Sequence, residues 1–522
     1  MGSVAPPRPV WPPSTATVTT RRPTLQWALA AGSDGARVQV CRDRACATSV
    51  TAFDAMGTTG TPAADLPTGV LFWRLLGRQS ALTGTTPSVV WELTVPARSG
   101  AIGAAWGSVL DANGDGVGDI LAGAPGVGGG TGRAYIHAGR AGAGITVPQL
   151  TRLTGLGGAN TYYGNAVSSA GDVNGDGYAD VLIGSYLAGV SNGRIDLYFG
   201  GPAGPGLVPS NTALAPEAGG YFGYSVAAAG DINRDGYGDI VVGAYLAAGA
   251  GRVHVFYGSA GGITGRPSVS LNSPAGGSAS FGYAVAGAGD VNGDGFADIV
   301  VGANGVGAGA GAAYLYLGGA AGLGATPAVS FTSAGGAFGS SVGGVGDLNG
   351  DGYPDVAVGA ERFGSSAGRA YVFLGRAGGP AAAATFSIAS PGAGSFFGTP
   401  VTAAGDVNND GFGDLLVGAQ NANGTAGQAH VFHGSAAGVA LSPSGTINGP
   451  DGVGGAFGYG AAGAGDVNAD GFGDIVVGAF SAAARAGRVH VFLGGAAGVS
   501  GTPQVSITGP DGAGALYGTS AD

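Results

Sequence analysis

The sequence predicts an all-β chain in which propeller blades repeat along most of its length. Three observations support this prediction. A nine-residue, aspartate-rich loop recurs seven times, its copies are spaced by 61, 59, 59, 57, 59 and 60 residues, and short apolar segments flank each copy. With 522 residues, 45 % of them hydrophobic, the chain can bury a large core. A repeat of this length fits one four-stranded blade.

The first hundred residues lie outside the repeats and predict a small β-sandwich over residues 1–96. Four segments alternate or run apolar as sandwich strands do, namely 22–30, 36–43, 70–78 and 88–95. Trp27, Trp73 and Trp91 are expected to anchor its core. The stretch resembles a fibronectin type III or immunoglobulin-like module. Residues 97–101 are the expected linker, and the propeller is expected over 102–522.

The two cysteines, Cys41 and Cys46, have four residues between them, close enough to bridge the arms of a hairpin. We therefore expect a disulfide formed in an oxidising compartment, rather than two free thiols. A zinc site is not expected, because two cysteines without a nearby histidine leave the metal under-coordinated.

Each aspartate-rich loop follows the pattern of "DVNGDGYAD" at residues 172–180. Oxygen-bearing side chains on alternate residues, with glycine sixth, are typical of loops that wrap a hard cation. An EF-hand needs a glutamate at position 12 and flanking helices, whereas position 12 is apolar in every copy and the flanks predict strands. Dockerin loops are much closer together. Three crowded carboxylates repel one another unless a cation lies among them.

The flanks of each loop repeat as well. An aromatic-glycine pair precedes the loop, as in Phe222-Gly223, although the first copy has Ile102-Gly103 instead. An apolar run such as 239–245, an alternating segment such as 251–258 and a looser one such as 267–273 follow the loop. Four short strands separated by glycine-rich turns make a propeller blade.

These motifs, with "LAGAP" at 121–125, resemble the FG-GAP repeats of the integrin α N-terminal propeller and its bacterial relatives. The resemblance implies a seven-bladed propeller with up to seven Ca²⁺ ions in the loops that join first and second strands. It assigns as ligands the side chains of loop positions one, three, five and nine and the carbonyl of position seven. By number these are Asp111, Asn113, Asp115, Val117, Asp119, Asp172, Asn174, Asp176, Tyr178, Asp180, Asp231, Asn233, Asp235, Tyr237, Asp239, Asp290, Asn292, Asp294, Phe296, Asp298, Asp347, Asn349, Asp351, Tyr353, Asp355, Asp406, Asn408, Asp410, Phe412, Asp414, Asp466, Asn468, Asp470, Phe472 and Asp474.

Charge and hydropathy exclude several classes of function. The formal net charge is −11 and no basic patch indicates nucleic-acid binding. No run approaches the 18 or so apolar residues of a membrane span. The N-terminus does not read as a signal peptide, and Met1, Gly2 and Ser3 are interpreted as a start placed after a removed leader. We expect a secreted or surface-displayed protein.

Catalysis is not expected. All five histidines fall in the third-strand register of the repeats, and the position of His254, His430 and His490 is filled by tyrosine or aspartate in other copies. Such interchange indicates a structural role. No serine lies in a nucleophile-elbow pattern.

Ligand binding is expected where the repeats differ. The residues that begin the loops after the second strands vary from copy to copy, on the face opposite the calcium loops, and in integrins that face binds ligand. The candidates are Tyr186, Tyr245, Glu361, Arg362, Phe363 and Phe480. One hypothesis is an adhesion module that binds a protein or glycan and holds structural calcium. The alternative is a self-assembling or envelope-decorating structural protein without a specific ligand.

The segment "ALYGTSAD" at 515–522 starts an eighth repeat and stops before any loop. It is either a cut repeat or a strand that fastens the ring by pairing with the first blade. We favour the second interpretation, because closure covers strand edges that would otherwise be exposed.

Overall fold

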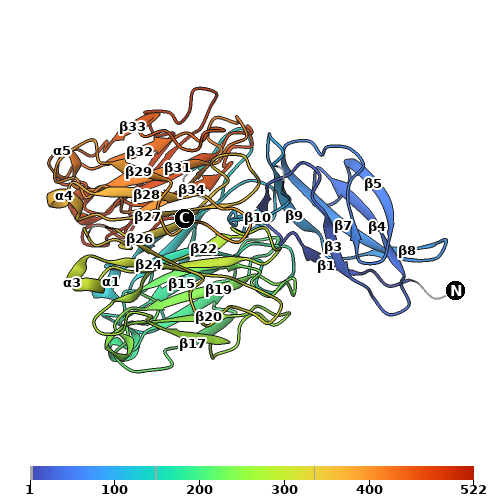
Figure 1. The fold of residues 1–522 in the computed structure, drawn as a ribbon, viewed down its shortest axis with the longest axis horizontal. Helices are drawn as coiled ribbons and strands as arrows, with labels where there is room; N and C mark the ends of the chain where they lie inside the picture. The colour runs from blue at the N-terminus through green and yellow to red at the C-terminus, as the bar shows by residue number, and fades with distance from the viewer. Residues whose placement is uncertain (1–3, 101, 147–149, 334) are drawn as a thin grey trace.

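The computed structural model describes residues 4–100, 102–146, 150–333 and 335–522. The ribbon divides into two parts that lie against each other (Figure 1). The N-terminal module, here residues 4–100, is drawn in blue on one side, and the propeller occupies the other side in cyan to red. No helix within the described residues is both long and apolar enough to cross a membrane.

The N-terminal module contains two sheets. The smaller has the order β1-β3-β6, and the larger has the order β10-β2-β9-β7-β4-β5, with β8 paired to β7. The strands are β1 (Arg8–Trp11), β2 (Ala16–Val18), β3 (Leu25–Ala28), β4 (Gly35–Cys41), β5 (Ser49–Met56), β6 (Thr59–Gly60), β7 (Gly69–Gln79), β8 (Leu82–Pro87) and β9 (Trp91–Val95), together with β10 (Ala105–Trp106), which follows the module in the chain and joins its larger sheet. Trp27 from the smaller sheet shares one buried cluster with Trp73 and Trp91 from the larger. All three tryptophans therefore lie in the core, as expected, while the likeness to fibronectin type III stays a prediction.

The rest of the described chain forms a β-propeller of small antiparallel sheets that follow one another in sequence order, seven of them in these residues. The first strands are β14 (Ala166–Gly171), β18 (Ser225–Gly230), β22 (Phe281–Gly289), β26 (Ser341–Gly346), β30 (Val401–Gly405) and β34 (Phe457–Gly465). The second strands are β11 (Ile120–Ala124), β15 (Asp180–Ser185), β19 (Asp239–Ala244), β23 (Asp298–Ala303), β27 (Asp355–Gly359), β31 (Asp414–Ala419) and β35 (Asp474–Ala479). The first strands lie against one another from sheet to sheet, so they form the inner ring.

The two outer strands of each sheet complete the blade. The third strands are β12 (Arg133–His137), β16 (Arg194–Tyr198), β20 (Arg252–Phe256), β24 (Ala312–Tyr316), β28 (Arg369–Phe373), β32 (Gln428–Phe432) and β36 (Arg488–Phe492). The fourth strands are β13 (Leu150–Thr154), β17 (Asn211–Leu214), β21 (Val269–Asn272), β25 (Val329–Thr332), β29 (Phe386–Ala389), β33 (Gly445–Asn448) and β37 (Val505–Thr508). Burial decreases outward: β19 is buried at every residue, whereas β21 has a single buried residue.

Short helical turns join second to third strands, on the side of the propeller away from the N-terminal module (Figure 1). They are α1 (Val127–Gly130), α2 (Ala188–Ser191), η1 (Ala247–Gly249), α3 (Val306–Gly309), α4 (Phe363–Ser366), α5 (Ala422–Thr425) and α6 (Ala482–Arg485).

The two glycine motifs of each repeat meet across the boundary between neighbouring blades. A Cβ added to Gly243, near the end of β19, would lie 2.0 Å from the carbonyl oxygen of Gly282 in the next blade. Gly184 approaches Gly223 in the same way, at 2.1 Å. No side chain fits at such a distance, so the motifs persist because the blades touch backbone to backbone there.

The last six residues pair with β11 along the edge where the first blade has no first strand. Gly518 N donates to Gly123 O at 2.9 Å, and Leu121 and Asp522 exchange backbone hydrogen bonds of 2.6 and 2.9 Å. The same segment also touches the last blade. A Cβ added to Gly478 would lie 2.0 Å from the carbonyl oxygen of Gly518. The pairing expected for residues 515–522 is therefore confirmed.

The residues at the expected start of the first repeat pair with the N-terminal module and not with the first blade. β10 pairs with β2 of the N-terminal module, with Ala105 opposite Val18 and Trp106 opposite Thr17. Because these residues complete the module's larger sheet, the inner position of the first blade is left to residues 517–522.

Candidate functional site

The aspartate-rich loops connect first and second strands, and their side chains fold back on the backbone. In the second copy, Asp172 accepts hydrogen bonds from the N–H groups of Asp176 at 3.0 Å and Gly177 at 2.8 Å. Asn174 accepts from Asp176 N at 2.9 Å, and Asp176 accepts from Tyr178 N at 3.1 Å. Each loop is thus a chain of side-chain-to-backbone turns that holds the oxygen-bearing side chains within a short segment.

The aspartate at loop position nine ties the loop to the sheet. Asp180 is fully buried, and its two carboxylate oxygens accept from Val173 N and Gly200 N, both at 2.9 Å. The equivalent residues make the same two bonds in every copy, namely Asp119, Asp239, Asp298, Asp355, Asp414 and Asp474. Position nine therefore has a structural role that the motif alone does not reveal.

Burial and crowding make the ionised loops electrostatically costly. Burial, and then the neighbouring Asp176 carboxylate, raise the pKa of Asp172 to about 8. Burial likewise raises the pKa of Asp231 to about 7 and that of Asp414 to about 8, with nearby aspartates adding to the effect. Buried and crowded carboxylates of this kind are stabilised either by taking up a proton or by a bound cation.

The structure places all the predicted ligand residues in these loops, seven sets of them. Within the described ranges, however, no group of three or more His, Cys, Asp or Glu side chains is arranged so that it could hold a metal ion. Several carboxylate oxygens point at backbone N–H groups instead, as described above. The assignment of calcium to these loops therefore stays a prediction.

Tyrosines gather on the other face of the propeller, where Tyr186 and Tyr245 follow β15 and β19. Tyr245 packs against Tyr224 with ring centroids 4.5 Å apart and against Tyr283 at 5.4 Å. Tyr186 lies 5.5 Å from Tyr224. The full set, called here the tyrosine cluster, is Tyr162, Tyr186, Tyr221, Tyr224, Tyr245 and Tyr283.

Two of the six predicted ligand-binding residues thus belong to the cluster, and four cluster members were not predicted. Tyr224 and Tyr283 directly follow aromatic-glycine pairs, and Tyr162 and Tyr221 directly precede them. These positions also vary between repeats, since Ser340 and Thr399 replace the following tyrosine in later copies. The comparison of repeats that singled out Tyr186 would have found the four other tyrosines if it had included the positions just before and just after the aromatic-glycine pair.

The other four predicted residues lie apart from the cluster or at its border. Phe480 packs against Tyr459, with 4.7 Å between ring centroids, and burial raises the pKa of Tyr459 to about 12, with Tyr283 and Glu361 adding to the rise. Glu361 accepts a hydrogen bond from Thr399 Oγ1 at 3.2 Å. The Arg362 side chain is 70 % exposed, whereas Phe363 lies under the guanidinium of Arg369 at 4.3 Å.

The third-strand histidines are accounted for by packing. His254 Nδ1 lies 2.8 Å from Ser270 Oγ, and its ring packs on Phe222 at 5.5 Å. His430 and His490 each have an equivalent hydroxyl neighbour, at 3.0 and 2.8 Å, and an equivalent phenylalanine. His490 Nε2 also lies 2.8 Å from Asp451 Oδ2. Burial lowers the pKa of His430 to about 4, so its ring is neutral at physiological pH.

Comparisons with known proteins agree with this geometry. The FG-GAP repeat model matches six segments, at 163–198, 222–256, 281–316, 338–373, 398–432 and 457–492. Integrin alpha-IIb of Mus musculus is 38 % identical over 157 residues, which are 28 % of this chain and 15 % of the relative. Integrin alpha pat-2 of Caenorhabditis briggsae is 33 % identical over 213 residues, which are 37 % of this chain and 17 % of the relative. The chain thus matches less than a fifth of the length of these curated relatives.

Solved structures are more distant. A Dos1 propeller is 13 % identical with a TM-score of 0.36, covering 69 % of this chain and 78 % of that one. The rhamnogalacturonan lyase YesW is 12 % identical with a TM-score of 0.32, covering 84 % and 71 %. Neither likeness bears on function. The six matched repeats and the integrin α relatives support an FG-GAP propeller that is similar to that of the integrin α chains.

Proposed function

We propose that this protein is an extracellular, integrin-α-like adhesion module that binds a protein or glycan ligand through the propeller face bearing the tyrosine cluster. The observation that carries the proposal is the cluster itself. Six tyrosines from successive repeats meet at one place, and rings that combine an apolar body with a polar tip are typical of binding surfaces. The integrin α relatives support an adhesive and extracellular role.

We also propose that the aspartate-rich loops hold up to seven Ca²⁺ ions, which stabilise the fold. The donor chemistry fits, because each loop offers three carboxylates, a carboxamide and backbone carbonyls, the oxygen ligands that calcium takes. A buried carboxylate such as Asp172, with its pKa raised to about 8, gains most from a nearby cation. Bound calcium would supply positive charge and cross-link each loop.

The proposal includes no catalysis. The histidines of the third strands have structural neighbours, and the interchange of His254 with tyrosine in other repeats argues against a shared reaction. The alternative, a structural protein without a specific ligand, is supported by exposed apolar residues such as Leu207 and Val208, which are 70 and 74 % exposed and could mediate self-association.

A glycan array and a pull-down from extracellular matrix extract, each with calcium and with chelator, test the proposal. The tyrosine variant is Tyr186→Ala with Tyr245→Ala, and the matched control is Leu441→Ala, which changes an exposed residue elsewhere. We expect binding by the wild type and the control and loss of binding by the tyrosine variant. Equal binding by all three proteins would reject the cluster as the site. Concentration-dependent association without any ligand would favour the alternative.

A further inference from the structure

The N-terminal module covers the aspartate-loop face of the propeller. Glycines at loop position six meet it directly: a Cβ added to Gly177 would lie 2.1 Å from Val90 O, and one on Gly411 would lie 2.3 Å from Arg98 Cβ. Arginines stack on the aromatic residue at position seven, with Arg8 over Tyr237 at 4.8 Å and Arg98 over Phe412 at 4.4 Å. The two parts therefore share an extended interface rather than a flexible tether.

Arg44 makes the most extensive of these contacts. Its Nε donates to Gly114 O and its Nη2 to Gly177 O, both at 2.8 Å, so one guanidinium spans the loops of the first two repeats. Its Nη1 donates to Val90 O within the module at 3.1 Å. The same group lies over the Tyr178 ring at 4.3 Å. A planar guanidinium suits this task because its donors are fixed in direction.

Arg44 also pairs with a buried acidic side chain. Its Nη2 lies 3.5 Å from Glu92 Oε2, and the Glu92 side chain is only 1 % exposed. Without Arg44, Glu92 of the module would lose this arginine partner at the propeller loops.

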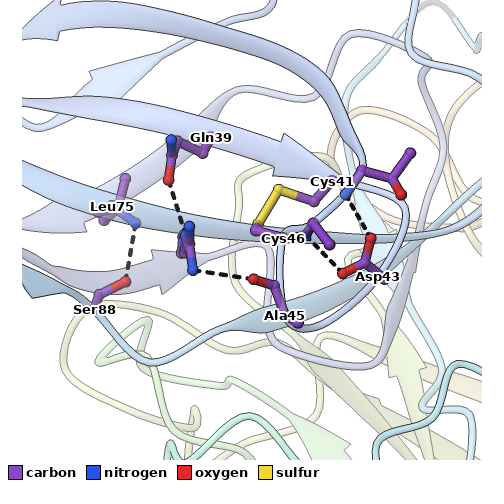
Figure 2. Close-up of a disulfide and its surroundings, with 10 residues drawn as sticks. Gln39, Cys41, Asp43, Ala45, Cys46, Leu75 and Ser88 are labelled. Carbon is purple, nitrogen blue, oxygen red and sulfur yellow. Dashed lines mark hydrogen bonds between the residues drawn. A yellow bond between two sulfur atoms is a disulfide. The ribbon is translucent and has the colours of Figure 1, made fainter.

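A disulfide holds Arg44 in place. Cys41 and Cys46 are joined (Figure 2). The bond closes the turn 41–46 just after β4, and Arg44 lies within this turn. Asp43 strengthens the same turn by accepting from Ala47 N at 2.8 Å and Thr48 N at 2.7 Å. Opening the disulfide would free the turn and with it the direction of the Arg44 side chain.

We propose that the disulfide-closed turn 41–46 is a redox-sensitive interdomain clasp, through which Arg44 holds the N-terminal module on the loops of the first two repeats. Reduction by a dithiol converts the disulfide to two thiols, and the dithiol is itself oxidised to a disulfide. The released module would uncover the aspartate-loop face. This inference does not depend on calcium or on the tyrosine cluster.

Limited proteolysis of residues 96–104 and small-angle X-ray scattering of the full chain test the clasp, both in calcium and in chelator. Reduced wild type, Arg44→Gln and Cys41→Ser with Cys46→Ser are compared with the oxidised wild type. The matched control is Arg37→Gln, an arginine within β4 whose ion pair with Asp54 is exposed. We expect cleavage in 96–104 to rise about tenfold and the particle to lengthen in the first three proteins, and no change in the control.

A double variant tests the pairing of Arg44 with Glu92. Arg44→Gln with Glu92→Gln also removes the acidic side chain that Arg44→Gln leaves without its arginine partner, so we expect cleavage to fall back part of the way toward the wild-type rate. Reduction of the folded wild type tests the role of the disulfide without a mutation, should Arg44→Gln fail to fold. Unchanged cleavage and unchanged scattering after reduction would overturn the proposal.

Discussion

The two faces of the propeller are built in opposite ways. The aspartate-loop face repeats three aspartates, an asparagine and a glycine at fixed positions in every copy, and it lies against the N-terminal module. The other face, where the short helical turns lie away from the module (Figure 1), changes from repeat to repeat and carries the tyrosine cluster. The uniform residues make contacts that every blade needs, such as the two bonds of Asp180, whereas the variable ones are free to specify a ligand.

Among the changes that distinguish the two faces, removal of calcium is expected to lower the stability of the protein most. Each filled site adds about 2.7 kcal/mol to the free energy of unfolding at a free calcium concentration of 100 times its dissociation constant. Several loops filled together should raise the melting temperature by ten degrees or more, on the order of 2–4 °C for each kcal/mol. Calorimetry with calcium and with chelator measures the shift, and magnesium serves as the control cation.

The next largest effect should come from loop position nine. Asp180→Ala leaves the N–H groups of Val173 and Gly200 without their side-chain acceptor and should lower the free energy of unfolding by roughly 3 kcal/mol, even in chelator. Asp176→Ala, in the same loop but partly exposed, should matter mainly when calcium is present. Denaturant unfolding of both variants with and without calcium separates the backbone hydrogen bonds of Asp180 from the contribution that each aspartate makes through bound calcium. Equal losses in chelator would contradict the distinction.

The third largest effect should be a pH dependence of the stability of the calcium-free protein. The pKa values of Asp172, Asp231 and Asp474 are raised to about 8, 7 and 7, above their values in the unfolded chain. Their protonated forms are favoured in the fold, so this contribution to stability is complete below about pH 4 and is lost as the pH rises through 7 to 8. In chelator, the melting temperature should fall by several degrees between pH 5.5 and 8.5. Calcium should reduce that fall, because it replaces the proton.

The smallest effect on stability is expected from the tyrosine cluster. Tyr245 is only half-buried, so Tyr245→Ala should change the free energy of unfolding by about 1 kcal/mol or less while it abolishes ligand capture. A fully buried aromatic, Phe281, gives the contrasting control, because Phe281→Ala should lower the free energy of unfolding by roughly 3–5 kcal/mol. A large stability loss for Tyr245→Ala would assign the tyrosines to the core instead.

Much of the fold follows from the sequence because its signals are local and repeated. The aromatic-glycine pairs, the loops and the strand patterns predicted the propeller, and the partial eighth repeat predicted the pairing of residues 517–522 with β11. The docking of the N-terminal module left no such signal. Arg44 binds the carbonyl oxygens of Gly114 and Gly177. Because every residue has a backbone carbonyl, no residue type in the sequence marks these two as acceptors.

The tyrosine cluster was only partly predictable for a different reason. Tyr186 and Tyr245 stand out at the ends of second strands, but Tyr224 and Tyr283 join them only because β18 and β22 begin next to those ends in space. Likewise, nothing in the nine-residue motif distinguishes the buried Asp180 from the more accessible Asp176. Both distinctions arise from tertiary packing rather than from spacing.

Equilibrium dialysis against radioactive calcium tests the central claim about the aspartate loops most directly. The account predicts saturable binding that approaches seven ions per chain, and a loss of about one ion when Asp172 and Asp176 are both changed to Ala. Absence of saturable binding at millimolar calcium, the level to which weak extracellular sites respond, would contradict it.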